Sequence, residues 1–403
     1  MRICELSNVE LTYNFLAPLF RALRADGHEV VAACRFDRGG TYLQHYLGDG
    51  YAFHEIPAAR RISIGSVTVD VLRLARYLRR ERFDVVHVHG PLVSMQARVA
   101  ARLARVPTVI YHAHGFYFHE GMAGRTYRAA RWLERTFCRH LTDVVVTINE
   151  EDLRLARRQR FRPDPGDIIH APGVGIDTER FSPQHPATDP DVAELRARLA
   201  PEPDATVVTF VGRLVGEKGV RELLVAFDAI AAARPHARLV IIGEQHSSER
   251  DHTTGAWVRQ FVTRSRAGER IMLLGRRHDV PDLLRATDVF VLPSHREGMP
   301  VSLLEAMATG LACVTTDVRG CREAVDGGAG VLVPPRDPAA LADVLATLAD
   351  DPQLRAAIGA QARRRVVDRY AVSQSVAPVR GVFRRIDGRT VNDRRRTPTT
   401  VRS

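Results

Sequence analysis

The feature that most constrains this chain is an alternation of short apolar runs with longer amphipathic segments along nearly its whole length. The apolar runs are rich in valine and isoleucine, and several contain no polar residue. Such runs are typical of strands covered on both faces, and a strand–helix–strand order predicts a parallel sheet wrapped by helices. Strands are therefore expected at 2–7, 29–34, 51–56, 84–88, 107–112 and 143–148, and again at 206–211, 238–243, 270–274, 289–292, 312–316 and 330–333.

Helical patterns lie between these runs, as at 66–82, 92–105, 124–140, 219–233 and 338–350. The alternation weakens only at 171–204, a stretch with six prolines that contains one short helical pattern at 191–199. We therefore expect an α/β protein of two Rossmann-like, doubly wound parallel-sheet domains that face a central cleft. The expected parts are a first domain at 1–175, a linker at 176–204, a second domain at 205–370, a helix at 371–387 that crosses back to the first domain, and a disordered basic tail at 388–403.

Composition narrows the class of protein. The formal net charge is +11, and Lys218 is the only lysine among 58 basic residues. The five cysteines are scattered without a C-x-x-C pair, which predicts a reduced cytoplasmic protein with neither disulfides nor a cysteine zinc site. The chain shows no secretory signal and no apolar run long enough to span a membrane. The positive charge suits nucleic acid, anionic lipid or phosphorylated small molecules, but aromatic residues do not alternate with the arginines, so we expect no nucleic-acid partner.

A glycine-rich loop follows the strand expected at 206–211. Gly212, Gly216 and Gly219 permit tight turns and close backbone approach, and Arg213 and Lys218 add two cations. The helix that begins near Gly219 offers unpaired N–H groups and a positive dipole end. Together they suit the binding of a diphosphate, and the alternative is an ordinary loop with two surface cations.

A second loop, at 294–310, follows the strand expected at 289–292. It contains two carboxylates, Glu297 and Glu305, with a glycine and a proline between them. Ser302-x-x-Glu305 fits a helix capping box, in which Glu305 bonds back to the helix start. The alternative is a carboxylate that accepts two hydroxyls of a ribose, and spacing alone favours the cap.

A histidine-rich segment, 111–120, follows the strand expected at 107–112. His112, His114 and His119 suggest a metal, but no cysteine or paired carboxylate lies nearby, and we expect no metal site. A polar contact inside the cleft suits a histidine at the end of a strand better. His87 and His89 end the preceding strand and are expected to line the same cleft.

A row of arginines runs along the helix expected at 124–140. Their spacing of mostly three and four residues forms one stripe, made of Arg125, Arg128, Arg131, Arg135 and Arg139. The simplest interpretation is a solvated face. The alternative is a surface attracted to anionic lipid head groups, with an affinity that falls as salt increases.

Four motifs together resemble a known family. They read G-R-L-V-G-E-K-G, L-G-R-R-H-D-V, E-G-M-P-V-S-L-L-E-A-M-A-T-G and G-G-A-G-V-L-V-P-P. They are similar to those of glycosyltransferase family 4, retaining enzymes of GT-B fold, and the resemblance covers about residues 1–385. It implies that the first domain binds the acceptor and the second the nucleotide sugar. Arg213 and Lys218 would hold the donor diphosphate, Glu305 the ribose and Glu297 the donor sugar, which His114 would contact from the first domain.

The resemblance also assigns the remaining residues of the site. Catalytic roles fall to His114, Glu297, Arg213 and Lys218, and no metal or other cofactor is required. The donor side further includes Gly212, Gly275, Arg276, Gly298, Met299, Pro300 and Val301, and the acceptor side includes Asn8, His89, His114 and His119. Many family members carry Gly-Gly after the first strand, where this chain has Ser7-Asn8-Val9-Glu10-Leu11-Thr12.

Two segments resemble one branch of the family. H-A-H-G-F-Y-F-H-E-G-M and F-D-V-V-H-V-H-G are similar to enzymes that extend capsule, exopolysaccharide or glycan-precursor chains on polyprenyl-diphosphate carriers. They imply a hexosyltransferase whose donor is a nucleotide-diphosphate sugar, with a UDP sugar favoured. The acceptor would be a lipid-linked saccharide at the inner face of the cell membrane. The alternatives are a phosphatidylinositol or small-molecule acceptor, a sugar-nucleotide epimerase, or a non-enzymatic protein that binds anions or membranes.

Overall fold

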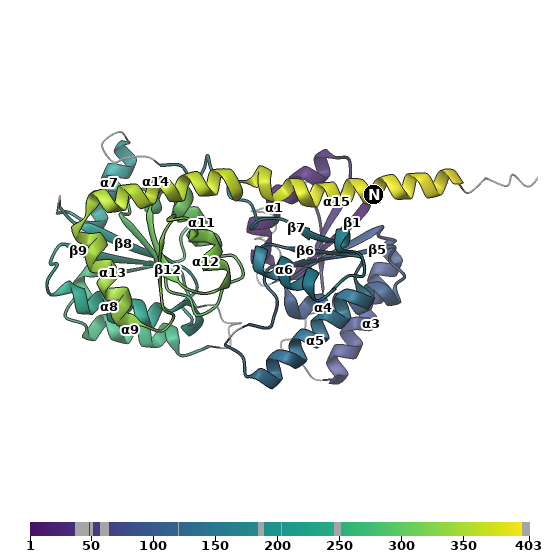
Figure 1. Ribbon diagram of the computed structural model, residues 1–403, viewed down its shortest axis with the longest axis horizontal. Helices are drawn as coiled ribbons and strands as arrows, with labels where there is room; N and C mark the ends of the chain where they lie inside the picture. Colours follow the sequence, from purple (N-terminus) through teal and green to yellow (C-terminus); the bar gives the residue numbers. More distant parts are fainter. Residues whose placement is uncertain are drawn as a thin grey trace, which may run out of the picture. The chain divides into compact units, whose positions relative to one another are not determined.

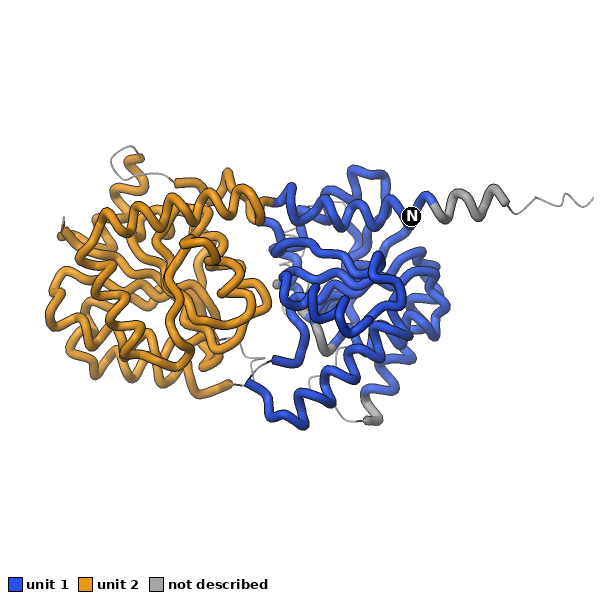
Figure 2. Tube along the Cα trace, viewed as in Figure 1, with its two compact units in different colours: residues 1–175, 372–403 blue, residues 176–371 orange. Residues whose placement is uncertain are grey.

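The computed structural model describes residues 1–36, 48, 51–56, 64–119, 121–183, 189–202, 204–245 and 251–396. The chain forms two compact units, one made of residues 1–175 and 372–403 and the other of residues 176–371 (Figure 2). Each unit is a parallel sheet wrapped by helices (Figure 1), so the expected pair of Rossmann-like domains is confirmed. Within the described residues, no helix is both long and apolar enough to cross a membrane.

The first unit contains a seven-stranded sheet in the order β3-β2-β1-β4-β5-β6-β7. All of its pairs are parallel, and β4 and β6 are buried along their full length. The two faces are both covered, because the neighbours Ile3 and Cys4 on β1 join different hydrophobic clusters. The strands are β1 (Arg2–Val9), β2 (Glu29–Arg35), β3 (Ala52–Glu55), β4 (Val85–His89), β5 (Thr108–Ala113), β6 (Val144–Thr147) and β7 (Ile168–His170).

The helices of the first unit include one from the far end of the chain. They are α1 (Tyr13–Ala25), α3 (Ile64–Glu81), α4 (Pro91–Leu103), α5 (Gly124–Leu141), α6 (Glu150–Arg158) and α15 (Val372–Arg396), with short 3-10 turns η1 (Glu10–Thr12) and η2 (Pro165–Asp167). Helix α15 packs Val379 and Phe383 into the same cluster as Phe20 of α1, and Arg380 pairs with Asp26.

Helix α15 also extends into the segment 388–403, for which the sequence analysis expects disorder. It continues to Arg396, and residues 397–403 lie outside the described part of the chain. The low apolar content that predicts disorder does not by itself prevent a helix from continuing beyond its packed part.

The second unit contains a six-stranded parallel sheet in the order β10-β9-β8-β11-β12-β13. The strands are β8 (Thr206–Val211), β9 (Ala237–Ile242), β10 (Ile271–Gly275), β11 (Val289–Leu292), β12 (Ala312–Thr316) and β13 (Val331–Val333). The chain leaves β8 toward β9 and later returns to the other side of β8 with β11. Ligands of such sheets bind outside the carboxyl ends of the two strands at which the order reverses.

The helices of the second unit begin before its first strand. They are α7 (Pro190–Leu199), α8 (Val220–Ala231), α9 (Thr254–Arg264), α10 (Val280–Arg285), α11 (Val301–Ala308), α12 (Arg319–Val325), α13 (Pro338–Asp350) and α14 (Pro352–Arg369), with 3-10 turns η3 (Gly216–Lys218) and η4 (Gly268–Arg270). The segment 176–204 was expected to be a linker. Its helix α7 instead buries Val192, Leu195 and Leu199 in a cluster with β8, β9 and α10, so it is part of the second unit's core.

Candidate functional site

The site residues that sequence analysis predicts form two groups, one in each unit. In the second unit, β8 and β11 lie side by side, with Val208 opposite Val289. The loops that leave their carboxyl ends carry Lys218 and Glu297, so both loops lie where the strand order of the sheet reverses.

Gly219 allows these two loops to touch. Its φ of +70° lies in the left-handed region, and a Cβ atom at this position would lie 1.9 Å from the carbonyl oxygen of Pro293. Only glycine combines this backbone conformation with this approach. Gly219 is also the N-cap of α8 and has no side chain with which to cap the helix, and a helix start of this kind suits the binding of an anion.

Lys218 and Glu297 form an ion pair across the two loops. The Lys218 Nζ atom lies 2.6 Å from Glu297 Oε1, to which the hydroxyl of Ser294 also donates at 2.7 Å. Only 18% of the lysine side chain and 10% of the glutamate side chain are exposed. The only lysine of the chain is therefore positioned by a carboxylate that lies 79 residues away in the sequence.

Further contacts join the same two loops. The backbone N–H of His295 donates to the Glu217 carbonyl at 2.8 Å, and the His295 ring lies 2.8 Å from a carboxylate oxygen of Glu222 on α8. Asp251 accepts hydrogen bonds from the Gly216 N–H at 2.7 Å and from Thr254, and these bonds, opposed by partial burial, hold its pKa far below the usual value. The loop that carries Arg213 and Lys218, called the cationic loop below, is thus held both by the loop after β11 and by Asp251.

Glu305 lies in the second turn of α11, which begins at Val301 with Pro300 as its N-cap. Ser302 therefore lies inside the helix, and the predicted capping box between Ser302 and Glu305 is wrong. Partial burial raises the pKa of Glu305 to about 7, although Arg180 acts in the opposite direction. A carboxyl group without a capping role and with a perturbed pKa is a candidate for ligand binding.

The other predicted donor residues surround these loops. Gly212 directly follows β8, and its N–H donates to the Ile242 carbonyl at 3.0 Å. Gly275 ends β10, and its carbonyl accepts from the Gly243 N–H at 2.7 Å. Gly243 approaches both, since a Cβ there would lie 1.9 Å from the Gly212 oxygen. Arg213 is exposed and Arg276 is half-buried, Met299 and Pro300 are buried, and Gly298 and Val301 are half-buried.

In the first unit, His89 and His114 are in direct contact. His89 Nδ1 lies 3.0 Å from His114 Nε2, and His89 Nε2 lies 2.7 Å from an oxygen of Glu5. Burial and the neighbouring imidazoles hold the pKa of His89 far below its usual value, and burial lowers that of His114 to about 3. Both rings are therefore neutral at physiological pH.

The remaining acceptor-side residues lie at two other places in the first unit. Asn8 is exposed near the end of β1, and His119 is half-buried in the segment before α5, where its carbonyl accepts the Met122 N–H at 3.0 Å. A cavity of about 20 Å³, enough for a single water, lies beside His114. It is lined by Phe15, Leu16, Leu19, His112, His114, Gly173, Val174, Ser375, Val376 and Val379.

Sequence analysis missed several residues that shape these groups. They are Glu5, Ser294, His295, Glu222 and Asp251. One signal was available, because Asp251 precedes Thr253 and Thr254 in the manner of a residue that accepts the N–H groups of a helix start. The others act across elements that only the folded sheet brings together.

Comparison with known proteins identifies the family of the chain. The chain matches the family model described as Glycosyl transferases group 1 over residues 191–365 and that described as Glycosyl transferase 4-like domain over residues 14–172. The Bacillus subtilis (strain 168) protein named "Putative glycosyltransferase EpsD" is 30% identical over 382 residues, which cover 92% of this chain and 93% of that protein. The UDP-Gal:alpha-D-GlcNAc-diphosphoundecaprenol alpha-1,3-galactosyltransferase of Escherichia coli is 29% identical over 346 residues, 85% of this chain and 86% of that protein.

Solved structures show the same fold. The Anabaena Alr3699/HepE protein, crystallised in complex with UDP-glucose, superposes with a TM-score of 0.77 at 19% identity and covers 95% of this chain and 99% of that one. The two family models, the Bacillus relative and the shared fold agree with one another. The chain therefore belongs to glycosyltransferase family 4, with its 4-like domain in the first unit and its group 1 domain in the second.

Proposed function

We propose that this glycosyltransferase transfers a hexose, with retention of anomeric configuration, from a nucleotide-diphosphate sugar to a polyprenyl-diphosphate-linked saccharide. The product would extend a cell-surface polysaccharide or glycan precursor. The observation that carries the proposal is the pair of loops at the ends of β8 and β11, which hold Lys218 beside Glu297 next to a helix start whose N-cap is a glycine. The donor site rests on this geometry, whereas the acceptor rests on the relatives.

The donor diphosphate would bind at the cationic loop. Lys218, Arg213 and the first N–H groups of α8 together supply two positive charges and a positive dipole end, which suit a diphosphate. The Escherichia coli relative is named for a UDP-galactose donor, and the Anabaena structure contains UDP-glucose. A UDP sugar is therefore the favoured donor.

Glu305 and Glu297 would bind the sugars of the donor. Ionised Glu305 is an acceptor for two ribose hydroxyls, and its raised pKa means that binding must favour the charged form. Glu297, held by Lys218 and Ser294, would lie against the donor sugar.

The chemical step would depend on electrostatic stabilisation of the leaving group. Negative charge develops on the diphosphate as its bond to the sugar breaks, and fixed cations and N–H groups stabilise that charge without reorganising. His114, a neutral imidazole, would contact the donor sugar as a hydrogen-bond partner. With these groups in place no metal is needed for transfer, and we expect undiminished activity in excess EDTA.

The acceptor proposal comes from the relatives. The Escherichia coli enzyme is named for a diphosphoundecaprenol acceptor. So is a Campylobacter jejuni N-acetylgalactosaminyltransferase that is 25% identical over 360 residues. Such an acceptor is embedded in a membrane, so the enzyme would work at the inner face of the cell membrane.

Helix α5 offers a surface for that membrane. Arg125 and Arg128 are exposed on it, and Trp132, one turn further, exposes 64% of its surface. An exposed tryptophan beside arginines is typical of helices that lie on anionic bilayers. The stripe is narrower than sequence analysis predicts, because Arg135 and Arg139 donate to the carbonyls of neighbouring loop residues.

The test begins with donor binding. A thermal-shift panel of UDP-, GDP- and ADP-sugars should stabilise the protein with one base preferred. The preferred donor is then incubated with polyprenyl-diphosphate-linked N-acetylglucosamine, and the lipid is examined for an added hexose and the configuration of the new linkage. A new sugar nucleotide formed without acceptor would instead support an epimerase. Transfer only to phosphatidylinositol or a small soluble sugar would replace the acceptor, and the absence of any nucleotide-sugar binding would refute the proposal.

A further inference from the structure

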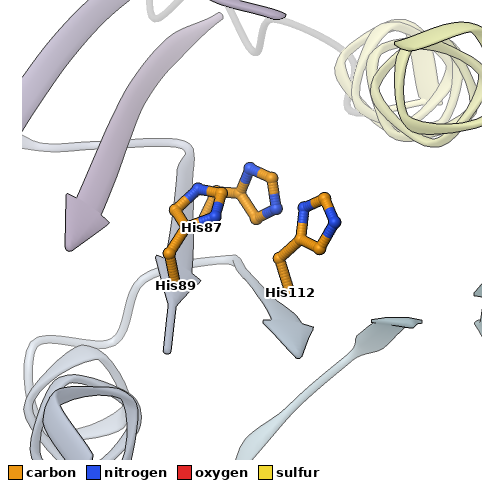
Figure 3. A group of neighbouring side chains, drawn as sticks. All are labelled: His87, His89 and His112. Atoms are coloured by element: carbon orange, nitrogen blue, oxygen red, sulfur yellow. The ribbon is translucent and has the colours of Figure 1, made fainter. Parts of the chain in front are cut away.

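Four histidines gather in the first unit at the carboxyl ends of β4 and β5. His87 and His89 end β4, His112 lies near the end of β5, and His114 follows it. The first three expose 0%, 1% and 4% of their surface. Each offers a ring nitrogen, and these nitrogens all lie within 4.8 Å of one another (Figure 3).

The carboxylate of Glu5, on the neighbouring strand β1, orients two of these rings. His87 Nδ1 lies 3.0 Å from Glu5 Oε1, and His89 Nε2 lies 2.7 Å from Oε2. A carboxylate only accepts hydrogen bonds, so both of these ring nitrogens carry the proton. In a neutral imidazole the other nitrogen then holds a lone pair, which is Nε2 in His87 and Nδ1 in His89.

The cluster contains buried nitrogens without hydrogen-bond partners. Within the described residues, neither His87 Nε2 nor either ring nitrogen of His112 has a partner. An unsatisfied buried polar atom is unfavourable, so three such atoms in one place suit the binding of a ligand. The lone pair of His89 accepts from His114 at 3.0 Å.

We propose that His87, His89 and His112 bind one divalent transition-metal ion of the zinc class, with Glu5 as the carboxylate that orients two of the ligands. Three imidazoles favour zinc or its neighbours over magnesium and calcium, which prefer oxygen ligands. A carboxylate behind a ligating histidine fixes the tautomer that coordination needs. The cavity beside His112 leaves space for a further ligand such as water.

This site adjoins the proposed transfer site, because the ion would use the His89 lone pair that otherwise accepts a hydrogen bond from His114. Metal binding is therefore measured without a nucleotide sugar and without turnover.

The experiment measures metal binding to the full-length chain. After treatment with chelator and its removal, the protein is titrated with Zn²⁺ by calorimetry, and Co²⁺ binding is followed by visible absorption. We expect one equivalent of Zn²⁺ to bind and Co²⁺ to give the intense absorption of a low-coordinate nitrogen site. Mg²⁺ should not compete.

Two variants and a control locate the site. Glu5→Gln should weaken Zn²⁺ binding by about 10- to 100-fold, because it removes the orienting carboxylate, and His112→Gln should weaken it at least as much. His140→Gln changes an exposed histidine of the same unit and should bind Zn²⁺ like the original protein. The proposal is overturned if the unaltered chain binds no stoichiometric Zn²⁺, if Co²⁺ retains its pale aqueous spectrum, or if folded His112→Gln binds Zn²⁺ with unchanged affinity.

Discussion

Replacing Lys218 by alanine tests the donor site most directly. Lys218 is the only lysine of the chain, and its Nζ atom lies 2.6 Å from Oε1 of Glu297. If the ammonium binds the donor diphosphate, Lys218→Ala must weaken the binding of UDP, which contains the diphosphate but no sugar. UDP as a probe separates the role of Lys218 from any contact between Glu297 and the donor sugar.

The size of the loss follows from the contact. A hydrogen bond to a charged group contributes about 1.5–3 kcal/mol, and about 1.4 kcal/mol corresponds to a tenfold change in the dissociation constant. Lys218→Ala should therefore weaken UDP binding by about 10- to 150-fold. Because Glu297 competes with the diphosphate for the same ammonium, the loss should fall in the lower part of this range. In a Glu297→Gln background UDP should bind more tightly, and Lys218→Ala should then cost more.

The original protein, Lys218→Ala, Glu297→Gln and the double variant form a double-mutant cycle. Isothermal titration calorimetry measures the UDP affinity of each. Arg234→Ala is the matched control. Arg234 lies just before the amino end of β9 and pairs with Asp350 at 3.0 Å, whereas the proposed site follows the carboxyl ends of β8 and β11. It removes one cation from an ion pair far from the proposed site and should leave UDP affinity unchanged. Urea unfolding confirms that each variant is folded.

Two results would refute this reasoning. Folded Lys218→Ala that binds UDP within twofold of the original protein would remove Lys218 from the diphosphate site. Additive effects of Lys218→Ala and Glu297→Gln would show that the ion pair does not compete with the ligand. Lys218→Arg adds a finer test, since the planar guanidinium cannot occupy the place of a compact ammonium that is only 18% exposed. Normal UDP affinity in Lys218→Arg would mean that the chemical nature of this cation is unimportant.

Three further predictions concern other parts of the molecule. Gly219→Ala should lower the free energy of unfolding by at least about 1–3 kcal/mol and abolish UDP binding, because its Cβ would collide with the Pro293 carbonyl; an unchanged urea midpoint would contradict this. Glu305 has a pKa near 7 against an ordinary 4.5, so the folded state holds a proton that the unfolded chain lacks, and stability should fall as pH rises between these values. Glu305→Gln should remove this dependence of the unfolding free energy on pH. If ionised Glu305 binds the ribose, UDP-glucose affinity should rise through pH 7 in the original protein and not in Glu305→Gln. An identical pH dependence of stability in both proteins would contradict the role of Glu305. Trp132→Ala should reduce sedimentation with anionic vesicles, with binding that weakens as salt increases, whereas Leu103→Ala, an exposed apolar change on another helix, should not.

The sequence predicts the fold well because continuous apolar strands and amphipathic helices leave few alternatives. All twelve expected strands are present. The sequence analysis does not predict β7, a strand of three residues in which the apolar run is only Ile168 and Ile169. The expected linker was also misread, since its prolines suggest an open segment whereas Leu195 and Leu199 of α7 are buried in the core of the second unit.

The sequence predicts the residues of the proposed donor site but not the contacts between them. Lys218 and Glu297 each follow a strand, and glycines mark both loops. Their pairing depends on β8 and β11 being neighbours, and periodicity cannot supply strand order. The helix that carries Glu305 begins at Val301 with Pro300 as its N-cap, two residues before the N-cap that the capping box requires.

The histidine cluster shows what strand order adds to such a prediction. Glu5 of β1 lies opposite His87 of β4, and His89 of β4 lies opposite His112 of β5. Alternate residues of a strand face the same side of a sheet. His87 and His89 on β4 therefore lie over the same face as Glu5 of β1 and His112 of β5, and His114 follows directly after β5. The segment 111–120 by itself contains no cysteine and no pair of carboxylates, which is why the sequence argues against a metal there. Once the order β1-β4-β5 is known, the same sequence places one carboxylate and four imidazoles together, and the absence of hydrogen-bond partners for His112 among the described residues becomes the reason to expect an ion.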